Sequence, residues 1–454
     1  MNDRISSDIL QIIDKDIASR YEIIPFLSDG TKCSCYGVSG REYADILRVL
    51  KAIRRLEFEV IPLPQKEFNK IFLSNYRTTV NVKIGSADFL NSLISEAYQS
   101  YCSDIHFECY EARYRIRFRI DGKLIEKYML EKQQYISLVN QIKIMASLDI
   151  AEKRLPQDGR IFYKDSASRF DVRVSVMPSI YGEKVVMRLL TRHPELLVLD
   201  NLGLTEKQLN DYKNAVSRPH GMVLVSGPTG SGKSTTLYAT LSMLNDIERN
   251  ILTVEDPVEY TLDGVNQVQV KEEIGLDFSS ALRTFLRQDP DVIMVGEIRD
   301  KETAEIAVRS SLTGHLVLST LHTNNALGCV SRLSEMGVSP FLLAETLNLL
   351  VSQRLIRLLC PSCKIQYEHR QGVTLYRKTG CAECYYTGYK GRKAIYEVVP
   401  INQETAEYIR HGQIAGLDLR RSGLTSLADS ALTLLRKGQT SLEEVISFID
   451  KEDI

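Results

Sequence analysis

The sequence predicts an α/β protein whose largest part is a mostly parallel sheet covered by helices, and three observations support this. From about Leu204 onward, apolar strand patterns alternate with helical patterns, as they do in successive strand–helix–strand units. A complete G-x-x-x-x-G-K-S motif lies between one of these strands and the helix that follows it. Hydrophobic residues make up 44 % and charged residues 25 %, which is typical of a globular protein and excludes a long disordered or low-complexity chain.

Length and charge limit the number of domains and the class of partner. At about 150 residues per domain, a chain of 454 residues predicts roughly three domains. The net charge of −1 argues against a protein that coats nucleic acid or an anionic membrane non-specifically. No apolar stretch approaches the ~20 residues that cross a bilayer, and no apolar signal-peptide core follows Met1. We therefore expect a cytosolic protein without direct membrane insertion. If it acts at a membrane, a partner must hold it there.

Two smaller regions precede the α/β region. The pattern predicts a small mixed module over residues 1–80 and a second domain over residues 81–192, which ends at a linker near His193-Pro194. In the second domain, the strand Arg113 to Ile120 alternates strictly and carries four arginines on one face. Aligned guanidinium groups repel one another when they have no partners. This face is therefore either an ordinary solvated strand face or a face presented to an acidic surface or a phosphate.

The α/β domain is expected over residues 200–454. Its core strands are predicted at residues 222–225, 251–254, 291–295 and 316–318, and two of its helices at 234–244 and 302–311. Ligands bind at the carboxyl ends of the strands in open α/β sheets. The polar residues that follow these strands are therefore the candidates for chemistry.

The strongest candidate is the glycine-rich motif after the first of these strands. It consists of Gly227, Pro228, Thr229, Gly230, Ser231, Gly232, Lys233 and Ser234. Its glycines let successive backbone N–H groups turn inward on a phosphate, and the helix N-terminus adds positive potential. In such a loop, Lys233 reaches the β- and γ-phosphates of ATP and the Ser234 hydroxyl binds Mg²⁺. A chance match to the bare pattern would not place it between an apolar strand and a helix.

Acidic residues follow two of the other strands. Glu297 follows the strand at 291–295, with a glycine before it where many P-loop enzymes carry a metal-binding aspartate. We expect Glu297 to polarise the attacking water while Ser234, the phosphates and water hold Mg²⁺. The alternative is a surface glutamate at a strand end. Glu255 follows the strand at 251–254 in an acidic turn, which is either part of the site or simply solvated.

Two histidines bracket the strand that begins at Leu316. The spacing of His315 and His322 does not place both side chains on one face of a continuous strand, so at most one points at the site unless the strand ends early. A lone histidine is more often structural. His322, which follows the strand, is our candidate for a sensor of the γ-phosphate.

Four of the nine cysteines form two pairs, Cys360-x-x-Cys363 and Cys381-x-x-Cys384. Disulfides are disfavoured in the cytosol. The spacing of the two pairs is that of a four-thiolate Zn²⁺ site. The alternative is two unrelated pairs. We predict a zinc module over residues 358–398, inserted in the α/β domain.

Many longer motifs, in order along the chain, resemble those of the secretion ATPases of type II secretion and type IV pilus assembly. They are Arg154 to Arg160, Gly182 to Leu189, the glycine-rich loop, Val254 to Glu259, Leu286 to Asp291, Gly296 to Asp300 and Thr313 to Asn324. The resemblance covers about residue 81 to the C-terminus. It implies a PAS-like second domain, a RecA-like motor domain and a homo-hexameric ring that works with inner-membrane secretion or pilus platform proteins.

The resemblance also implies roles for single residues. Glu255, Asp256 and Glu259 resemble the family's aspartate box, Glu297 its Walker B glutamate, and His315 and His322 its histidine box. Gly296 before Glu297 is the family form. Arg154 and Arg169 lie where members present arginines to the nucleotide, and the alternative is that both only brace the second domain. A tetracysteine module is usual in secretion and pilus-extension motors, and retraction motors lack it.

The sequence thus predicts a hexameric ATPase motor for type II secretion through pseudopilus assembly, cytoplasmic and recruited to the inner membrane by partners. A pilus-extension motor is the alternative within the class, and the sequence does not separate the two. A DNA-uptake or nucleic-acid translocation motor that grips DNA through Arg113 to Arg119 is disfavoured, because the net charge is near neutral and no interleaving of aromatic and basic residues is suited to base stacking. A non-hydrolysing nucleotide sensor is a third alternative. Residues 1–80 form a shorter N-terminal block than in many members, and their docking partner is open.

Overall fold

The structure, a computed structural model, describes residues 5, 7–75, 87–111, 113–164, 169–190, 194–370 and 373–449. The chain divides into two compact units. The first comprises Met1–Thr191 and Arg357–Gly391, and the second comprises Arg192–Ile356 and Arg392–Ile454. The predicted linker falls at the division between the units, although its His193 lies outside the described residues. The cysteine module is thus grouped with the N-terminal domains.

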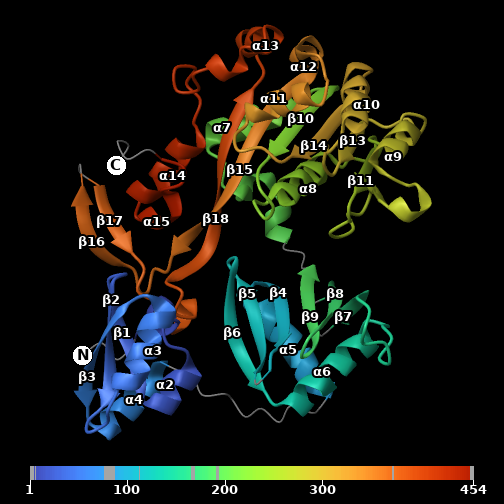
Figure 1. Ribbon diagram of the computed structural model, residues 1–454. Helices are drawn as coiled ribbons and strands as arrows, with labels where there is room; N and C mark the ends of the chain where they lie inside the picture. Colours follow the sequence, from blue (N-terminus) through green and yellow to red (C-terminus); the bar gives the residue numbers. More distant parts are fainter. Residues whose placement is uncertain are drawn as a thin grey trace. The chain divides into compact units, whose positions relative to one another are not determined.

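The second unit contains a seven-stranded sheet in the order β12-β11-β13-β14-β10-β15-β18 (Figure 1). The strands are β10 (Gly221–Ser226), β11 (Ile251–Glu255), β12 (Asn266–Gln269), β13 (Val292–Val295), β14 (Leu316–Leu321), β15 (Leu347–Leu359) and β18 (Tyr389–Pro400). Every neighbouring pair from β12 to β15 is parallel. The predicted parallel sheet is therefore present.

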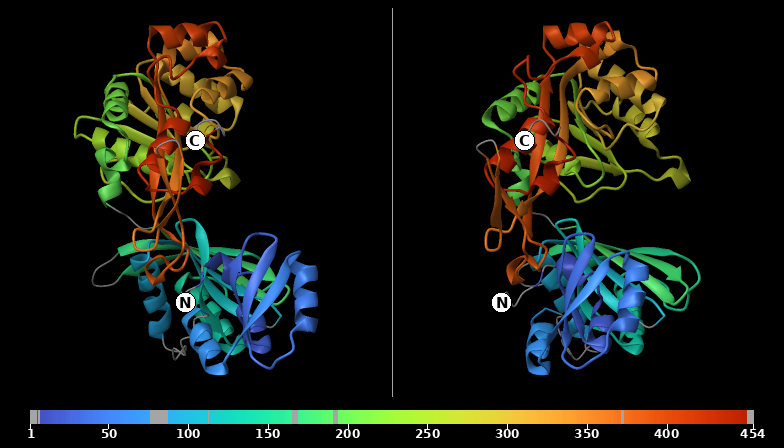
Figure 2. Two further views of the ribbon diagram at one scale, coloured as in Figure 1. Left: turned by 90° about the vertical axis from the view of Figure 1, so that its left-hand side faces the viewer. Right: turned by 60° about the vertical axis from the view of Figure 1, so that its left-hand side comes forward.

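Helices cover both faces of this sheet (Figures 1 and 2). Met222 and Leu224 of β10 pack on one side, and Val223 and Val225 pack on the other. The first side is covered by α9 (Phe278–Phe285), α10 (Lys301–Leu312), α11 (Gly328–Glu335), α12 (Pro340–Thr346) and α13 (Gln403–Arg410), and the second by α7 (Glu206–Val216) and α8 (Lys233–Leu244). Burial on both faces explains why these strands read as continuous apolar runs. Two further helices, α14 (Leu427–Arg436) and α15 (Leu442–Val445), lie near the C-terminus.

The register of the strands brings the candidate segments to one edge of the sheet. Ser226 at the end of β10 pairs with Leu321 at the end of β14. Val295 at the end of β13 pairs with Ser319 of β14 and with Val254 of β11. Because parallel strands end at the same edge, the segments that follow these four strands are neighbours. This is the arrangement that the sequence predicted.

The first unit begins with a small domain on a three-stranded sheet, β1 (Ile23–Ser28), β2 (Lys32–Val38) and β3 (Glu57–Leu63). β1 and β2 are antiparallel, whereas β2 and β3 are parallel and are joined through α3 (Ala44–Arg54). The other helices are α1 (Ser7–Leu10), α2 (Lys15–Tyr21) and α4 (Gln65–Asn75). In the described parts of the chain, no helix combines the length and the apolar character of a membrane span.

The second domain is an antiparallel six-stranded sheet in the order β6-β5-β4-β9-β8-β7. The strands are β4 (Cys102–Cys109), β5 (Tyr114–Ile120), β6 (Lys123–Leu130), β7 (Gln157–Lys164), β8 (Arg169–Ser179) and β9 (Gly182–Leu190). Two helices, α5 (Ala87–Gln99) and α6 (Lys132–Met145), pack on one face and form the core with Ile116 and Phe118 of β5.

The arginines on the other face of β5 are paired with acids inside the sheet. Arg115 and Arg117 both bond Glu108 of β4, at 2.8 and 2.5 Å. Arg113, directly before β5, pairs with Glu126, and Arg119 pairs with Asp104. The acids lie on the neighbouring strands β4 and β6. The repulsion between aligned guanidinium groups is therefore relieved within the domain, and an external phosphate is not needed for this.

A cysteine-rich module lies between β15 and β18 in the sequence. It contains the antiparallel hairpin β16 (Ile365–Arg370) and β17 (Val373–Arg377), followed by a short 3₁₀ turn, η4 (Ala382–Cys384). Two tyrosines after this turn, Tyr385 and Tyr386, have left-handed backbone conformations with φ of 51° and 60°.

Candidate active site

The glycine-rich loop between β10 and α8 has a backbone that only glycine accommodates. Gly227, Gly230 and Gly232 have φ of 150°, 77° and 92°, values that side chains other than glycine rarely adopt. A Cβ on Gly227 would lie 2.5 Å from the carbonyl oxygen of Gln353, and one on Gly232 would lie 2.7 Å from the Nε2 atom of the same residue. The close approach of the β15 backbone therefore requires glycine at position 227, whereas at position 232 the left-handed φ is what favours glycine.

Three side chains of this loop are placed to meet a phosphate. Ser231 Oγ is buried and has no hydrogen-bond partner among the described residues, so a ligand oxygen would satisfy it. Lys233 Nζ donates to the carbonyl oxygens of Gly227 and Pro228 at 2.7 and 3.2 Å. Burial lowers the pKa of Lys233, and an anionic phosphate would supply a counter-charge. Ser234 is exposed in the first turn of α8. The loop therefore fits a nucleotide with its cation.

Glu297 and His322 line one cleft at the carboxyl edge of the sheet. Glu297 Oε2 lies 3.5 Å from His322 Nε2, and the two side chains are 20 % and 50 % exposed. The charge of Glu297 also acts on Lys233, where it opposes the effect of burial on the lysine pKa. The other residues that line this cleft are Ile298, Arg299, Leu321 and Arg332. A carboxylate that is held near the lysine and still reached by solvent is able to orient a water molecule.

Arg299 is a member of this cleft that the sequence analysis did not single out. It forms an ion pair with Glu297, and its Nη1 lies 3.3 Å from Asp256 Oδ2. The hydrogen bond that Arg299 donates to Glu297 raises the pKa of Arg299, and the Asp256 charge adds to this. Arg299 therefore links the acidic turn after β11 to Glu297. The only sequence signal for Arg299 was its position two residues after Glu297. Spacing within a loop does not predict the direction of a side chain.

The structure places the Glu255 carboxylate inside the sheet and not in the cleft. Glu255 is buried and accepts hydrogen bonds from Tyr238 of α8, from Thr253 Oγ1 at 2.6 Å and from Gln267 Nε2 at 3.1 Å. Both carboxylate oxygens are thus occupied by protein donors. The next residue, Asp256, pairs with Arg299, which lines the cleft.

The two histidines lie at opposite ends of β14. His322 follows the strand and enters the cleft. His315 precedes the strand, and its Nδ1 lies 2.9 Å from the carbonyl oxygen of Ser310 in α10. Six strand residues at about 3.3 Å each separate them. The structure therefore brings His322, but not His315, to Glu297.

Arg154 and Arg169 belong to the first compact unit, whereas the glycine-rich loop belongs to the second. Arg154 is 88 % exposed and its guanidinium bonds Glu152 in its own loop, at 3.1 and 3.3 Å. Arg169 begins β8 and its guanidinium lies 4.9 Å from the centre of the Phe162 ring. Their predicted role toward the nucleotide stays a prediction.

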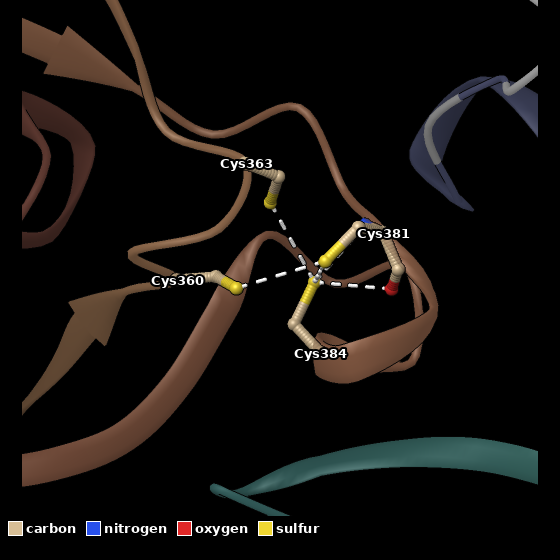
Figure 3. Close-up of side chains that lie close together, drawn as sticks. All are labelled: Cys360, Cys363, Cys381 and Cys384. Carbon is tan, nitrogen blue, oxygen red and sulfur yellow. Dashed lines mark hydrogen bonds between the residues drawn. The ribbon is translucent and has the colours of Figure 1, made fainter.

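The four cysteine side chains of the two pairs point toward one another (Figure 3). All four sulfur atoms lie within 4.8 Å of one another, with Cys360–Cys381 at 3.7 Å and Cys363–Cys384 at 3.8 Å. Four thiolates around Zn²⁺ at about 2.3 Å in a tetrahedron would stand about 3.8 Å apart. The backbone N–H groups of Cys381 and Gly388 donate to the Cys384 sulfur, both at 3.2 Å, as they do to thiolates. The cluster fits one tetrahedral metal ion.

The turn that carries the last two cysteines also contacts the second domain. Tyr385 donates through its hydroxyl to Ser100 Oγ at 3.1 Å. Lys127, which is only 7 % exposed and bonds Glu96 at 2.6 Å, lies 4.7 Å from the centre of the Tyr385 ring. The N–H of Gly391 donates to Asp121 Oδ2 at 2.8 Å. Folding of the cysteine module is therefore tied to an edge of the second domain.

Comparison with known proteins identifies the relatives of this chain. The model of a family described as "Type II/IV secretion system protein" matches residues 85–447. The Type II secretion system ATPase E of Vibrio cholerae serotype O1 is 49 % identical over 371 residues, and the match covers 79 % of this chain and 74 % of that protein. The Type IV pilus assembly ATPase PilB of Myxococcus xanthus is 50 % identical over 376 residues, and the match covers 79 % of this chain and 66 % of that protein.

Two solved structures resemble the fold. The pilus retraction motor PilT with bound ADP gives a TM-score of 0.58 at 26 % identity, over 80 % of this chain and 98 % of that chain. The ATPase DotB of Legionella pneumophila gives 0.62 at 21 % identity, over 80 % of this chain and 95 % of that chain, and shows the fold alone. The predicted α/β ATPase fold is confirmed. The chain belongs to the Type II/IV secretion system protein family, the secretion ATPases.

Proposed function

We propose that this chain is a homo-hexameric, Mg²⁺-dependent ATPase motor that powers type II protein secretion, through pseudopilus assembly, at the inner membrane. The observation that carries the proposal is the meeting of the glycine-rich loop, Glu297 and His322 at one edge of the sheet. The α/β domain is its RecA-like motor, and the six-stranded domain is PAS-like. The protein acts in the cytoplasm and is recruited by inner-membrane platform proteins, for which the N-terminal domain is the docking module.

The chemistry follows from the placement of these side chains. The N–H groups of the loop and Lys233 hold the β- and γ-phosphates of ATP. Glu297 Oε2 accepts a hydrogen bond from the attacking water and takes up its proton, and His322, 3.5 Å away, contacts the γ-phosphate. Mg²⁺ held by Ser234 and the phosphates would neutralise developing charge. The buried carboxylate of Glu255 supports the edge of the sheet without contact with the phosphates.

Replacing His322 by alanine should lower turnover about 10- to 100-fold, because a charge-assisted hydrogen bond to the γ-phosphate is lost. Steady-state ATPase rates over a range of ATP concentrations measure this. His411→Ala is the matched control, because His411 is exposed at the end of α13 and should turn over like the parent. Parent-like rates for His322→Ala would remove its role as a γ-phosphate sensor.

We also propose that Cys360, Cys363, Cys381 and Cys384 bind one Zn²⁺ per chain. The sulfur separations and the backbone donors to sulfur support this. Zn²⁺ would contribute free energy of folding to the module. Each side chain serves as a thiolate ligand, and the turn between Cys381 and Cys384 carries Tyr385 toward the second domain.

Cys381→Ser should release the metal and loosen the module while the glycine-rich loop keeps its affinity for nucleotide. Metal analysis of freshly purified, reduced protein should find about one Zn²⁺ per chain in the parent, and hydrogen exchange should accelerate around Tyr385 and in β6 of the variant. Cys329→Ser is a control, since Cys329 lies in another core and the variant should keep its metal. Parent protein without zinc would contradict the proposal.

A pilus-extension motor is the second candidate, and the similarity to PilB of Myxococcus xanthus supports it. Lys233→Ala introduced at the gene's own locus separates the two. We expect secreted proteins to accumulate inside the cells while surface pili persist. Lost pili with normal secretion would instead assign the pilus function. The DNA-translocation alternative has less support, since the β5 arginines already have acidic partners.

A further inference from the structure

Glu397 is a buried carboxylate in β18 for which the nucleotide chemistry gives no role. The residue is 4 % exposed. Its Oε1 accepts a hydrogen bond from the backbone N–H of Ala326 at 2.8 Å, and its Oε2 accepts one from the N–H of Leu427 at 3.3 Å. Burial raises the pKa of Glu397, and the two backbone donors oppose this. Burying a carboxylate is costly, so its two partners indicate what it holds in place.

The two N–H groups belong to segments that are far apart in the sequence. Ala326 lies in the loop between His322, at the end of β14, and α11. Leu427 is the first residue of α14, where helical N–H groups lack partners in their own helix and favour a negative charge. One side chain therefore ties the loop after the proposed γ-phosphate sensor to the start of a C-terminal helix.

Arg354 of β15 also bonds the loop after His322, through a backbone carbonyl group of that loop. Its guanidinium donates to the carbonyl oxygen of Asn324 at 2.7 Å. A Cβ on Gly227 would lie 3.0 Å from Arg354 Nη1, so this guanidinium also lies against the glycine-rich loop. Burial lowers the pKa of Arg354, and the charge of Glu397 opposes this effect. The loop after His322 is thus held between the buried carboxylate of Glu397 and the partly buried guanidinium of Arg354.

We propose that Glu397 is a positioning residue for ATP hydrolysis, which fixes the loop after His322 and couples that loop to helix α14. Glu397 does not contact ATP; it acts by holding Ala326, four residues from His322. A displacement of α14 would move the Glu397 carboxylate through its hydrogen bond to Leu427, and would thereby shift the loop after His322. The effect on hydrolysis rests on the proposed function, whereas the hold on the loop does not.

The first test is Glu397→Gln, which keeps the shape but turns an NH₂ group toward one of the two N–H donors. We expect hydrogen exchange to accelerate in residues 322–330 and at the start of α14, measured without nucleotide. Turnover should fall about 10-fold or more, with the KM for ATP within about 2-fold of the parent value. The control Glu404→Gln, at an exposed acid of α13, should change none of these.

The second test acts from the helix side and stands even if Glu397→Gln folds poorly. Leu427→Pro removes the N–H that bonds Glu397, at the first helical position where proline is tolerated, and Leu427→Ala removes the side chain but keeps the N–H. Coupling predicts faster exchange in residues 322–330 and slower turnover for the proline variant than for the alanine variant. Equal exchange and turnover in these two variants would overturn the coupling.

The readouts separate this proposal from the proposed function. Unchanged exchange in residues 322–330 of Glu397→Gln, or parent-like turnover, would overturn the positioning role. If the proposal holds, the double variant Glu397→Gln, His322→Ala should be little slower than His322→Ala alone, because both changes act through one loop. Parent-like turnover of His322→Ala itself would instead count against the proposed function, and the exchange data would still report whether Glu397 holds the loop.

Discussion

Glu297→Gln should bind ATP like the parent protein and hydrolyse it at least ~100-fold more slowly, the usual scale for the loss of a general base. The glutamine side chain has nearly the same shape, but its amide does not take up a proton from water. Lys233 and the glycine-rich loop are unaltered, so nucleotide affinity is preserved. Single-turnover hydrolysis together with equilibrium binding of a fluorescent nucleotide separates the two quantities.

The ion pair between Glu297 and Arg299 makes a matched control important. In Glu297→Gln the neutral amide no longer forms an ion pair with Arg299, and Arg299 is then free to move together with its second partner, Asp256. Such a movement would account for part of the rate loss. Arg299→Gln removes the ion pair and keeps the carboxylate, so its rate measures that part. Glu302→Gln, which breaks an exposed ion pair with Arg283 nearby in the fold, should behave like the parent. A parent-like rate for Glu297→Gln would remove Glu297 from its proposed role.

Lys233→Ala tests the binding of the phosphates, as Glu297→Gln tests the activation of water. The alanine variant removes the ammonium that the loop holds over Gly227 and Pro228. It should abolish nucleotide binding or turnover, whereas Glu297→Gln spares binding. The two variants together therefore distinguish the site that holds the phosphates from the group that activates water.

The arrangement of the site was predictable because its signals are local and because the sheet is parallel. Strands buried on both faces appear as apolar runs such as Met222 to Val225, and the glycine-rich loop is recognised from its own residues. Parallel strands end at one edge, so the order of the motifs along the chain was enough to bring Glu297 and His322 to that loop.

The direction of side chains in loops and at strand ends was harder to predict. Alternation along β11 places Glu255 on the same face as Thr253 and Ile251, which is the side of α8. This signal was available, and it would have suggested that the carboxylate faces Tyr238. No comparable rule gives the pairing of Arg299 with Glu297, because loop residues have no fixed periodicity.

The arginines of β5 show that the sequence of a single strand does not reveal which residues of the neighbouring strand lie opposite its own. Asp104 and Glu108 alternate along β4 in the same way as the arginines do along β5. Only the pairing of the strands, with Asp104 opposite Arg119 and Glu108 opposite Arg115, shows that the two charge patterns neutralise each other. Register, and not the spacing within a strand, decides between a paired face and one that needs an external partner.

Arg169→Ala should keep the fold and near-normal affinity for ATP but lose most turnover, because an arginine delivered to the transition state contributes about 10³- to 10⁵-fold in rate. The structure favours Arg169 over Arg154 for this test. Arg154 is held by Glu152 in its own loop, whereas among the described residues no acidic side chain pairs with Arg169. Phe162→Leu removes the ring beneath Arg169 and is the control for a bracing role. If Arg169→Ala hydrolyses ATP like the parent, the charge must come from another residue.

Mixing two inactive variants shows which chain supplies the arginine. An Arg169→Ala chain has an intact glycine-rich loop, and a Lys233→Ala chain has an intact arginine. If Arg169 serves a neighbouring site, the proposed ring, when it contains both chains, includes sites where an intact loop meets an intact arginine, and some activity returns. If Arg169 serves its own chain, no site in the mixed ring has both groups, and the mixture stays inactive at every ratio. Recovery that rises and then falls as the ratio is varied would therefore establish action between chains, and it would also require that the chains assemble with one another.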